Sequence, residues 1–196
     1  MTTVLVVILL SSCRGDETAS IDFSVTPVQV VHDMYMLQSG KGEAVMRMSA
    51  PLMERYSYTK DSTEVSYEIY SGGFLVKEYI ENGTLETTIE AEKAKHVTTA
   101  GAESWSAFGN VVITNYIKGE RMETDTIYWN REEQQIYTDC YVRLTSDSNL
   151  LQGYGMTSDE RARNAIILRP FDWYAIDRDS TYQYIDTINQ MGPARR

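Results

Sequence analysis

Apolar and polar residues alternate with a period of two along most of the chain, a pattern typical of β-strands with one buried face. In the clearest run, the residues that share one face are Ile136, Thr138, Cys140, Val142 and Leu144. Asn82-Gly83 separates two β-rich runs, and this dipeptide tolerates the positive φ angles of a tight hairpin turn. Lys118-Gly119 and residues 130–133 occupy similar places between later runs. The pattern predicts a meander of antiparallel hairpins.

A second pattern interrupts this alternation. Four times, a small residue precedes an apolar one by three positions, in segments 50–53, 91–94, 124–127 and 153–156. Because successive side chains on a strand point to opposite faces, this odd spacing puts both residues inside only at an irregular point. We therefore expect a bulge or sharp bend in each segment. The segments are unevenly spaced, so internal duplication and chance similarity among β-strands both stay open.

Helical spacing is almost absent between Ser24 and Pro170. The best candidate is a turn or two at Asp159–Arg163, with Ser158 as its cap. The last convincing strand is Ala165–Leu168, and residues 172–196 show no clear periodicity. We predict an all-β domain over residues 23–171, followed by a disordered tail over 172–196.

The N-terminus resembles a bacterial lipoprotein signal. Val4–Leu10 is an apolar run, long enough for a signal-peptide core and too short to cross a bilayer. Leu10-Ser-Ser-Cys13 then matches a lipobox, in which cleavage precedes the cysteine and the thiol receives a diacylglyceryl group. Residues 1–3 carry no Lys or Arg, so we expect the true start to lie upstream. The pattern predicts a signal peptide over 1–12 and a flexible tether over 13–22, lipidated at Cys13.

Composition narrows the function without naming it. The 196 residues suit one domain, and fourteen tyrosines against four phenylalanines suit strands that are half buried. A net charge of −10 argues against binding to nucleic acid, which needs a basic surface. With Cys13 acylated, Cys140 has no partner for an intramolecular disulfide, and we expect it to be a core residue.

Candidate catalytic groups are few. His32 and His96 have no Cys or His at ligand spacing, and Ser104, Ser106 and Ser158 lack the sequence context of a nucleophile elbow. Carboxylates lie mainly at polar positions and in turns, although a pair acting as in a glycosidase stays open. We expect no enzyme activity, no metal site and no cofactor.

Three segments carry a resemblance to a known family: 108–129, 136–142 and 151–156. They resemble LptC, the membrane-anchored periplasmic component of lipopolysaccharide export, and especially its lipoprotein-like members from Bacteroidetes. The resemblance extends over residues 24–170, and it identifies the wider LptA/LptC/OstA group better than a single member. The lipobox favours LptC, because LptA is released without an anchor. The best-studied members keep an uncleaved transmembrane helix, and we expect a lipid to replace it here.

This resemblance implies an open β-jellyroll, a V-shaped stack of antiparallel hairpins like that of OstA. Its apolar trough takes the acyl chains of lipid A from an LptBFG-type ABC transporter and passes them to an LptA-like bridge protein. The candidates for the trough lining are Leu85, Ile89, Ile113, Met122, Ile136 and Val142, each with core packing as the alternative. Met46, Met48 and Met122 could supply an adaptable surface or simply fill gaps.

The resemblance also implies docking by β-augmentation, in which an exposed sheet edge pairs with a neighbouring protein. The first strand, near Val28–Leu37, is then expected to face the transporter. The last strand is expected to meet the bridge protein through Ala165, Ile166, Ile167 and Leu168.

Two alternative functions are consistent with these sequence features. The first is lipopolysaccharide export by a protein held at the periplasmic side of the inner membrane. The second is a generic anchored β-sandwich lipoprotein that binds glycan or peptide through tyrosine-rich faces. Asp16-Glu17 is an imperfect signal for surface export, so an anchor in the outer membrane or at the surface stays open.

Overall fold

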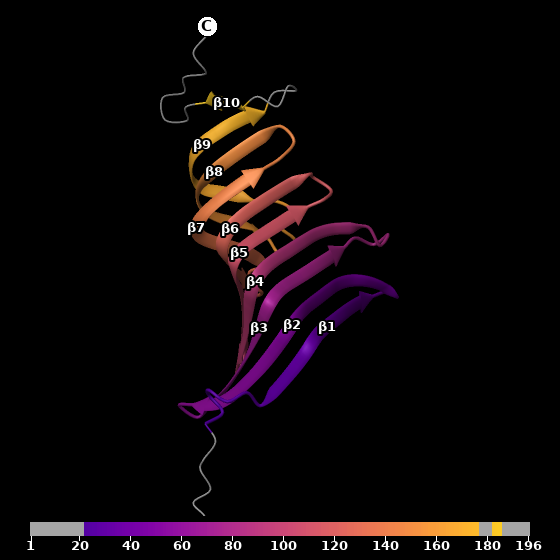
Figure 1. Cartoon of the computed structure of the whole chain (residues 1–196), viewed down its shortest axis with the longest axis vertical. Coiled ribbons are helices and arrows are strands. Elements are labelled where there is room, and N and C mark those ends of the chain that lie inside the picture. The colour runs from indigo at the N-terminus through magenta and orange to yellow at the C-terminus, as the bar shows by residue number, and fades with distance from the viewer. Residues whose placement is uncertain (1–21, 177–181, 186–196) are drawn as a thin grey trace, which may run out of the picture.

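The computed structural model describes residues 22–176 and 182–185, which form one open sheet without helices (Figure 1). Each strand pairs with the next along the chain, and every pairing is antiparallel. The strands are β1 (Gln29–Gly40), β2 (Glu43–Lys60), β3 (Thr63–Tyr79), β4 (Leu85–Thr99), β5 (Ala102–Asn115), β6 (Glu120–Asn130), β7 (Gln135–Thr145), β8 (Asn149–Asp159), β9 (Ile166–Ile176) and β10 (Tyr182–Ile185). The meander predicted from the sequence is confirmed.

The predicted hairpin turns lie where the sequence places them. Asn82-Gly83 connects β3 to β4, with Gly83 at a φ of 75° and its amide donating to the carbonyl of Ile80 at 2.9 Å. The Oδ1 of Asn82 accepts from the amide of Thr84 at 2.9 Å. Residues 116–119 and 131–134 form the two later turns. These local contacts satisfy backbone groups that the strand pairing leaves free.

A line of bulges crosses the sheet. All eight residues that begin and end the four odd-spaced segments are buried, and the pairing register shifts at each segment. The additional residue belongs to the neighbouring strand: Glu90 and Lys93 of β4 pair with Val112 and Phe108 of β5, which are one position further apart. Positive φ angles at this line include those of Gly73 at 113° and Gly109 at 81°. The expected bulges are confirmed.

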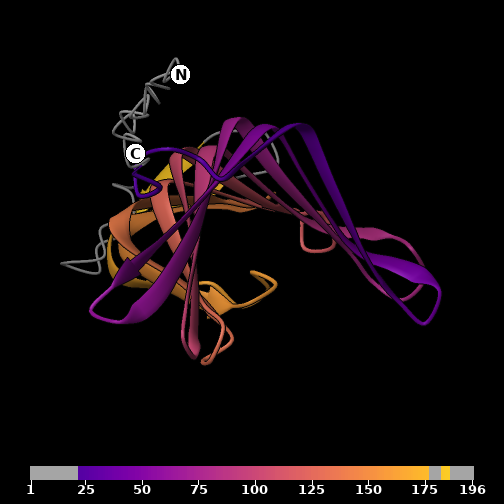
Figure 2. The ribbon, with the colours of Figure 1, turned by 90° about the horizontal axis from the view of Figure 1, so that it is seen from below.

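These bulges bend the strands and curl the sheet into an open trough. Figure 2 shows the strands from below as a V, most widely spread at the indigo and magenta N-terminal strands. The bulge line divides the trough into two limbs. The first limb contains the cross-strand row Met48–Val76–Ile89, and the second contains the row Trp105–Trp129–Ile136.

The packed core lies on the inner face of the trough. Its most buried side chains come from β4 to β8 and include Ala94, Val111, Ile113, Ile136, Val142 and Met156. In contrast, β1 is exposed along most of its length. The inner face is therefore filled by side chains toward the C-terminal strands and more open at β1.

The sheet extends further than the sequence predicted. Ala165 precedes β9, which runs to Ile176, and β10 pairs with Trp173–Ile176 of β9. The prediction that strand structure ends at Leu168 was therefore wrong. Residues 172–176 lack alternation, but backbone pairing with β8 does not depend on side-chain pattern. The remaining tail, the signal peptide, Cys13 and the tether up to residue 21 lie outside the described residues.

Candidate functional site

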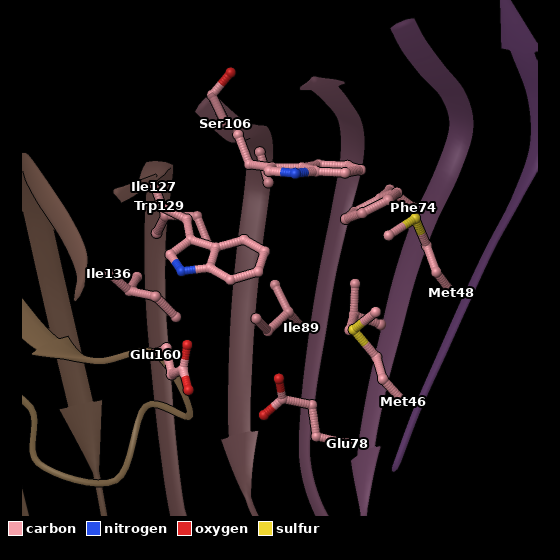
Figure 3. Close-up of a pocket in the computed structure, with 13 residues that line it drawn as sticks. Met46, Met48, Phe74, Glu78, Ile89, Ser106, Ile127, Trp129, Ile136 and Glu160 are labelled. Atoms are coloured by element: carbon pink, nitrogen blue, oxygen red, sulfur yellow. The ribbon is translucent and has the colours of Figure 1, made fainter. Parts of the chain in front are cut away.

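An apolar pocket lies inside the trough, between its two limbs (Figure 3). Its cavity volume is about 60 Å³, and the pocket is partly open to solvent. The lining residues are Met46, Met48, Phe74, Val76, Glu78, Ile89, Trp105, Ser106, Ala107, Ile127, Trp129, Ile136 and Glu160. Most of these side chains are aliphatic, aromatic or thioether groups, so the pocket suits an elongated apolar ligand.

Strand alternation and the bulges together position these side chains. In the first limb, Met48 pairs with Val76 and Val76 with Ile89. In the second limb, Trp105 pairs with Trp129. Residues two positions apart on a strand point to the same face. Each of these residues lies an even number of positions from a buried residue, with no bulge between them, so it also faces inward. The bulge turns one row toward the other, which creates the pocket.

An aromatic group closes one side of the pocket. The ring of Trp105 stacks on Tyr70, Phe74 and His96, with centroid distances of 5.6, 6.3 and 4.2 Å. Its Nε1 donates to Glu103 at 3.2 Å. This hydrogen bond and the stacked rings hold Trp105 in one orientation.

His96 supports this aromatic group. Its Nδ1 lies 3.1 Å from Glu68 Oε2, and its Nε2 lies 3.0 Å from Glu103 Oε1. The hydrogen bond with His96 is the largest cause that lowers the pKa of Glu68 to about 2, and bonds from Tyr70 and Arg55 add to it. His96 therefore bridges two carboxylates under the ring of Trp105, which is a structural role.

The opposite end of the pocket is polar. Among the described residues, the buried side-chain polar atoms without a hydrogen-bond partner are Glu78 Oε2, Trp129 Nε1 and Ser158 Oγ. Burial raises the pKa of Glu78 to about 7. The carboxyl group of Glu160 lies at the same end as Glu78 (Figure 3).

A short segment bridges the two limbs at this polar end. This segment, residues 160–165, connects β8 to β9 and is called the strap below. Arg161 forms an ion pair with Glu86 at 3.3 Å, and its carbonyl accepts from Thr87 Oγ1 at 3.1 Å. Lys118 donates to the carbonyl of Arg163. The strap begins at the second limb and contacts the first, so it closes the trough on one side of the pocket.

The strap is a turn, whereas the sequence predicted a helical turn capped by Ser158. Asp159, rather than Ser158, holds the backbone of this turn, because its Oδ1 accepts from the amides of Arg161 and Arg163 at 3.1 and 2.8 Å. Ser158 instead lies within β8 with its side chain buried. Ala162 has a φ of 54° and packs into the core cluster. A residue in this left-handed backbone conformation cannot continue a right-handed helix.

The structure separates the predicted lining residues into two groups. Ile89 and Ile136 line the pocket. Ile113, Met122 and Val142 are 3%, 4% and 0% exposed and belong to the packed core, while Leu85 is half buried at the start of β4. Contact of these four with a ligand stays a prediction.

Sequence reasoning missed the aromatic part of the lining. Trp105 and Trp129 line the pocket but were not among the candidates. Trp105 lies two positions from the buried Ala107, and Trp129 lies two positions from the buried Ile127. Alternation outward from the bulges would have placed both inside. Met46 and Met48, considered in the sequence as an adaptable surface, do line the pocket.

The two ends of the sheet present edges. β1 pairs only with β2 in the described part of the chain. On β9, Ile166 and Leu168 are 62% and 54% exposed, whereas Ile167 is buried and Ala165 packs against the core from the strap. β10 pairs with residues 173–176 alone, so among the described residues the outer edge of 166–170 has no paired strand.

An open antiparallel sheet, curled into a trough around an apolar pocket, defines the class of open β-jellyrolls. The family described as "Lipopolysaccharide-assembly, LptC-related" matches residues 2–170, and the chain belongs to this family. No curated protein matches the chain significantly. Membership places the protein in lipopolysaccharide transport at the cell envelope, as the resemblance in the sequence implied. The described residues contain no helix long and apolar enough to span a membrane.

Proposed function

We propose that this protein is a membrane-anchored periplasmic component of lipopolysaccharide export. It takes the acyl chains of lipid A from an LptBFG-type ABC transporter in the inner membrane and passes them to an LptA-like bridge protein. The observation that carries this proposal is the apolar pocket between the two limbs of the trough. Family membership supports the choice of lipopolysaccharide over the glycan or peptide ligand of the alternative.

The pocket can hold an acyl chain through burial alone. Each methylene removed from water contributes about 0.8 kcal/mol. Met46 and Met48 add flexible thioether side chains that adapt to chains of different shape. The open N-terminal half lets a chain enter from the side, while the strap bounds the pocket toward β8 and β9.

Transfer to and from the trough would use the sheet edges. In this proposal, β1 adjoins the transporter and the exposed part of β9 pairs with the bridge protein by β-augmentation. Neighbouring sheets would then continue one trough into the next, so that an acyl chain need not cross water.

Photo-crosslinking tests the proposed cargo. Photoreactive residues in place of Met48 and Ile136 should capture lipopolysaccharide in cells, and only while the transporter hydrolyses ATP. Glu90 is the matched control, because it adjoins Ile89 in β4 but is exposed on the other face. Equal capture from Glu90, or no lipid captured from the pocket positions, would reject the acyl-chain site.

The anchor is proposed to be a diacylglyceryl group on Cys13, held at the inner membrane. Replacing Cys13 with Ala should move the protein from the membrane fraction to the soluble periplasmic fraction, since the acyl chains supply the membrane affinity. Cell fractionation measures this. Retention of the Cys13→Ala variant in the membrane would exclude the lipid as the anchor.

A further inference from the structure

The polar end of the pocket contains hydrogen-bonding groups without partners. Buried polar atoms in native proteins are nearly always bonded to protein or ordered water, because an unpaired one costs about 1–3 kcal/mol. In the described part of the chain the unpartnered buried side-chain atoms are those of Glu78, Trp129 and Ser158, and the first two residues line the pocket. The atoms of Glu78 and Trp129 therefore border an otherwise apolar space in which a polar group of a ligand can supply their partners.

These groups come from different strands, and two of them, Glu78 and Trp129, line the same pocket. Trp129 pairs with Ile136, and Ile136 pairs with Ser158, so the three side chains form one row on the inner face. Glu78 faces this row from the first limb. In Figure 3 the carboxyl groups of Glu78 and Glu160 lie at one end of the pocket, and the Trp129 nitrogen is on the side of Ile136 and Glu160.

The unpaired atoms include both donors and acceptors. The Nε1 of Trp129 can only donate, whereas the hydroxyl of Ser158 can donate and accept. Burial favours the protonated form of the Glu78 carboxyl group, which then also has an O–H donor. A hydroxyl group on a ligand in the pocket can accept from Trp129 or donate to Glu78, and an unsubstituted alkyl chain can do neither.

We propose that this end of the pocket recognises a hydroxyl group on an acyl chain, and that the trough thereby selects hydroxyacyl chains over plain acyl chains. The inference rests on the proposed function, to which it adds the chemistry of the chain. Trp129 and Glu78 are the specificity-determining residues, while the aliphatic and aromatic lining supplies the general affinity.

Competition between two fatty acids tests this selection. The purified full chain is offered an equimolar mixture of stearate and a hydroxystearate isomer, and native mass spectrometry measures the ratio of the two complexes. Across a set of isomers, the best one should bind roughly threefold to tenfold more tightly than stearate, as expected for one net hydrogen bond. Trp129→Phe keeps an aromatic ring but loses the N–H, and should bring this ratio close to one.

Trp105→Phe is the matched control, because the N–H of Trp105 already donates to Glu103. It should weaken both complexes alike and keep the ratio of the wild type. Glu78→Leu is a second variant, which keeps the test valid if the Trp129→Phe protein does not fold. It should also lower the ratio of the hydroxystearate complex to the stearate complex.

The possible outcomes separate the inference from the proposed function. A wild-type ratio near one, with stearate bound, overturns the hydroxyl selection but keeps the acyl-chain site. If neither Trp129→Phe nor Glu78→Leu lowers the ratio, these two residues do not determine the selection. If neither fatty acid binds, the acyl-chain site fails and the selection fails with it.

Discussion

At the scale of single residues, two carboxyl groups on the inner face of the trough have pKa values displaced in opposite directions. Glu68 accepts hydrogen bonds from His96, Tyr70 and Arg55, which lower its pKa to about 2. Glu78 is buried and leaves one oxygen unpaired, so its pKa rises to about 7. The first carboxylate stabilises the fold in its charged form, whereas burial makes the charged form of the second carboxyl group less favourable than its neutral form.

Replacing Glu78 with Gln should therefore change how stability depends on pH. The folded pKa of about 7 exceeds the ordinary 4.5, so the folded protein retains a proton that the unfolded chain loses. Wild-type stability should fall as the pH rises from about 4.5 through about 7, with a total loss of up to about 3 kcal/mol. Glu78→Gln cannot ionise and should lose this dependence.

Urea unfolding at pH 5 and pH 8 measures the effect. The charged groups that act on Glu78 are Glu86, Glu160, Arg161 and Arg163, and all are unchanged in the variant. If wild type and variant lose the same stability between the two pH values, Glu78 does not titrate in this range.

At the scale of secondary structure, glycine permits the close approach of two strands at the bulge line. A Cβ added to Gly153 in β8 would meet the Cγ2 of Ile167, and would lie 2.6 Å from the carbonyl oxygen of Arg169 and 2.9 Å from the Cα of Pro170. Two of these atoms are backbone, which cannot rotate away. The small residue of this odd-spaced segment therefore sets how closely β8 and β9 pack.

Gly153→Ala should destabilise the protein by about 2–3 kcal/mol, because β9 must shift to make room. Gly83→Ala is the comparison: no atom lies within 4 Å of its added Cβ, and it bears only the strain of a positive φ, about 1 kcal/mol. Urea midpoints measure both variants. A smaller loss at Gly153 than at Gly83 would mean that β9 yields easily.

At the scale of the whole molecule, one continuous trough joins two sheet edges. Ten strands in sequence order leave β1 at one end and β9 with β10 at the other. An open sheet with exposed edges would invite aggregation unless a partner covers them. The exposed apolar residues Ile166 and Leu168 lie at the C-terminal edge, which is the surface proposed above for a partner strand.

Replacing Ile166 and Leu168 together with Lys should weaken binding of an LptA-like bridge protein by at least about tenfold, the factor that corresponds to 1.4 kcal/mol. Folding stability should change little, since both side chains are exposed. The control is Ile117→Lys, an exposed apolar position in the turn between β5 and β6. Equal weakening by Ile117→Lys would show that general surface charge, rather than the edge, controls binding.

Much of the fold was predictable because strands and bulges follow from local geometry. Alternation along 136–144 and the Asn82-Gly83 dipeptide predicted strands and a turn that the structure contains. The odd-spaced segments predicted the bulges for the same reason: side-chain direction on a strand depends only on position along it. β10 was not predictable in this way, because it depends on pairing with β9 rather than on its own pattern.

The sequence by itself determined which residues face inward and where each strand bends, and it carried the resemblance to the family. Only the tertiary structure decided which inward residues line an open pocket, such as Met48 and Trp129, and which are enclosed in the core, such as Val142. It also decided that the strap crosses to Glu86 and that one carboxyl oxygen of Glu78 has no hydrogen-bond partner among the described residues. These features depend on the distance between two limbs, which contacts between residues far apart in the sequence determine.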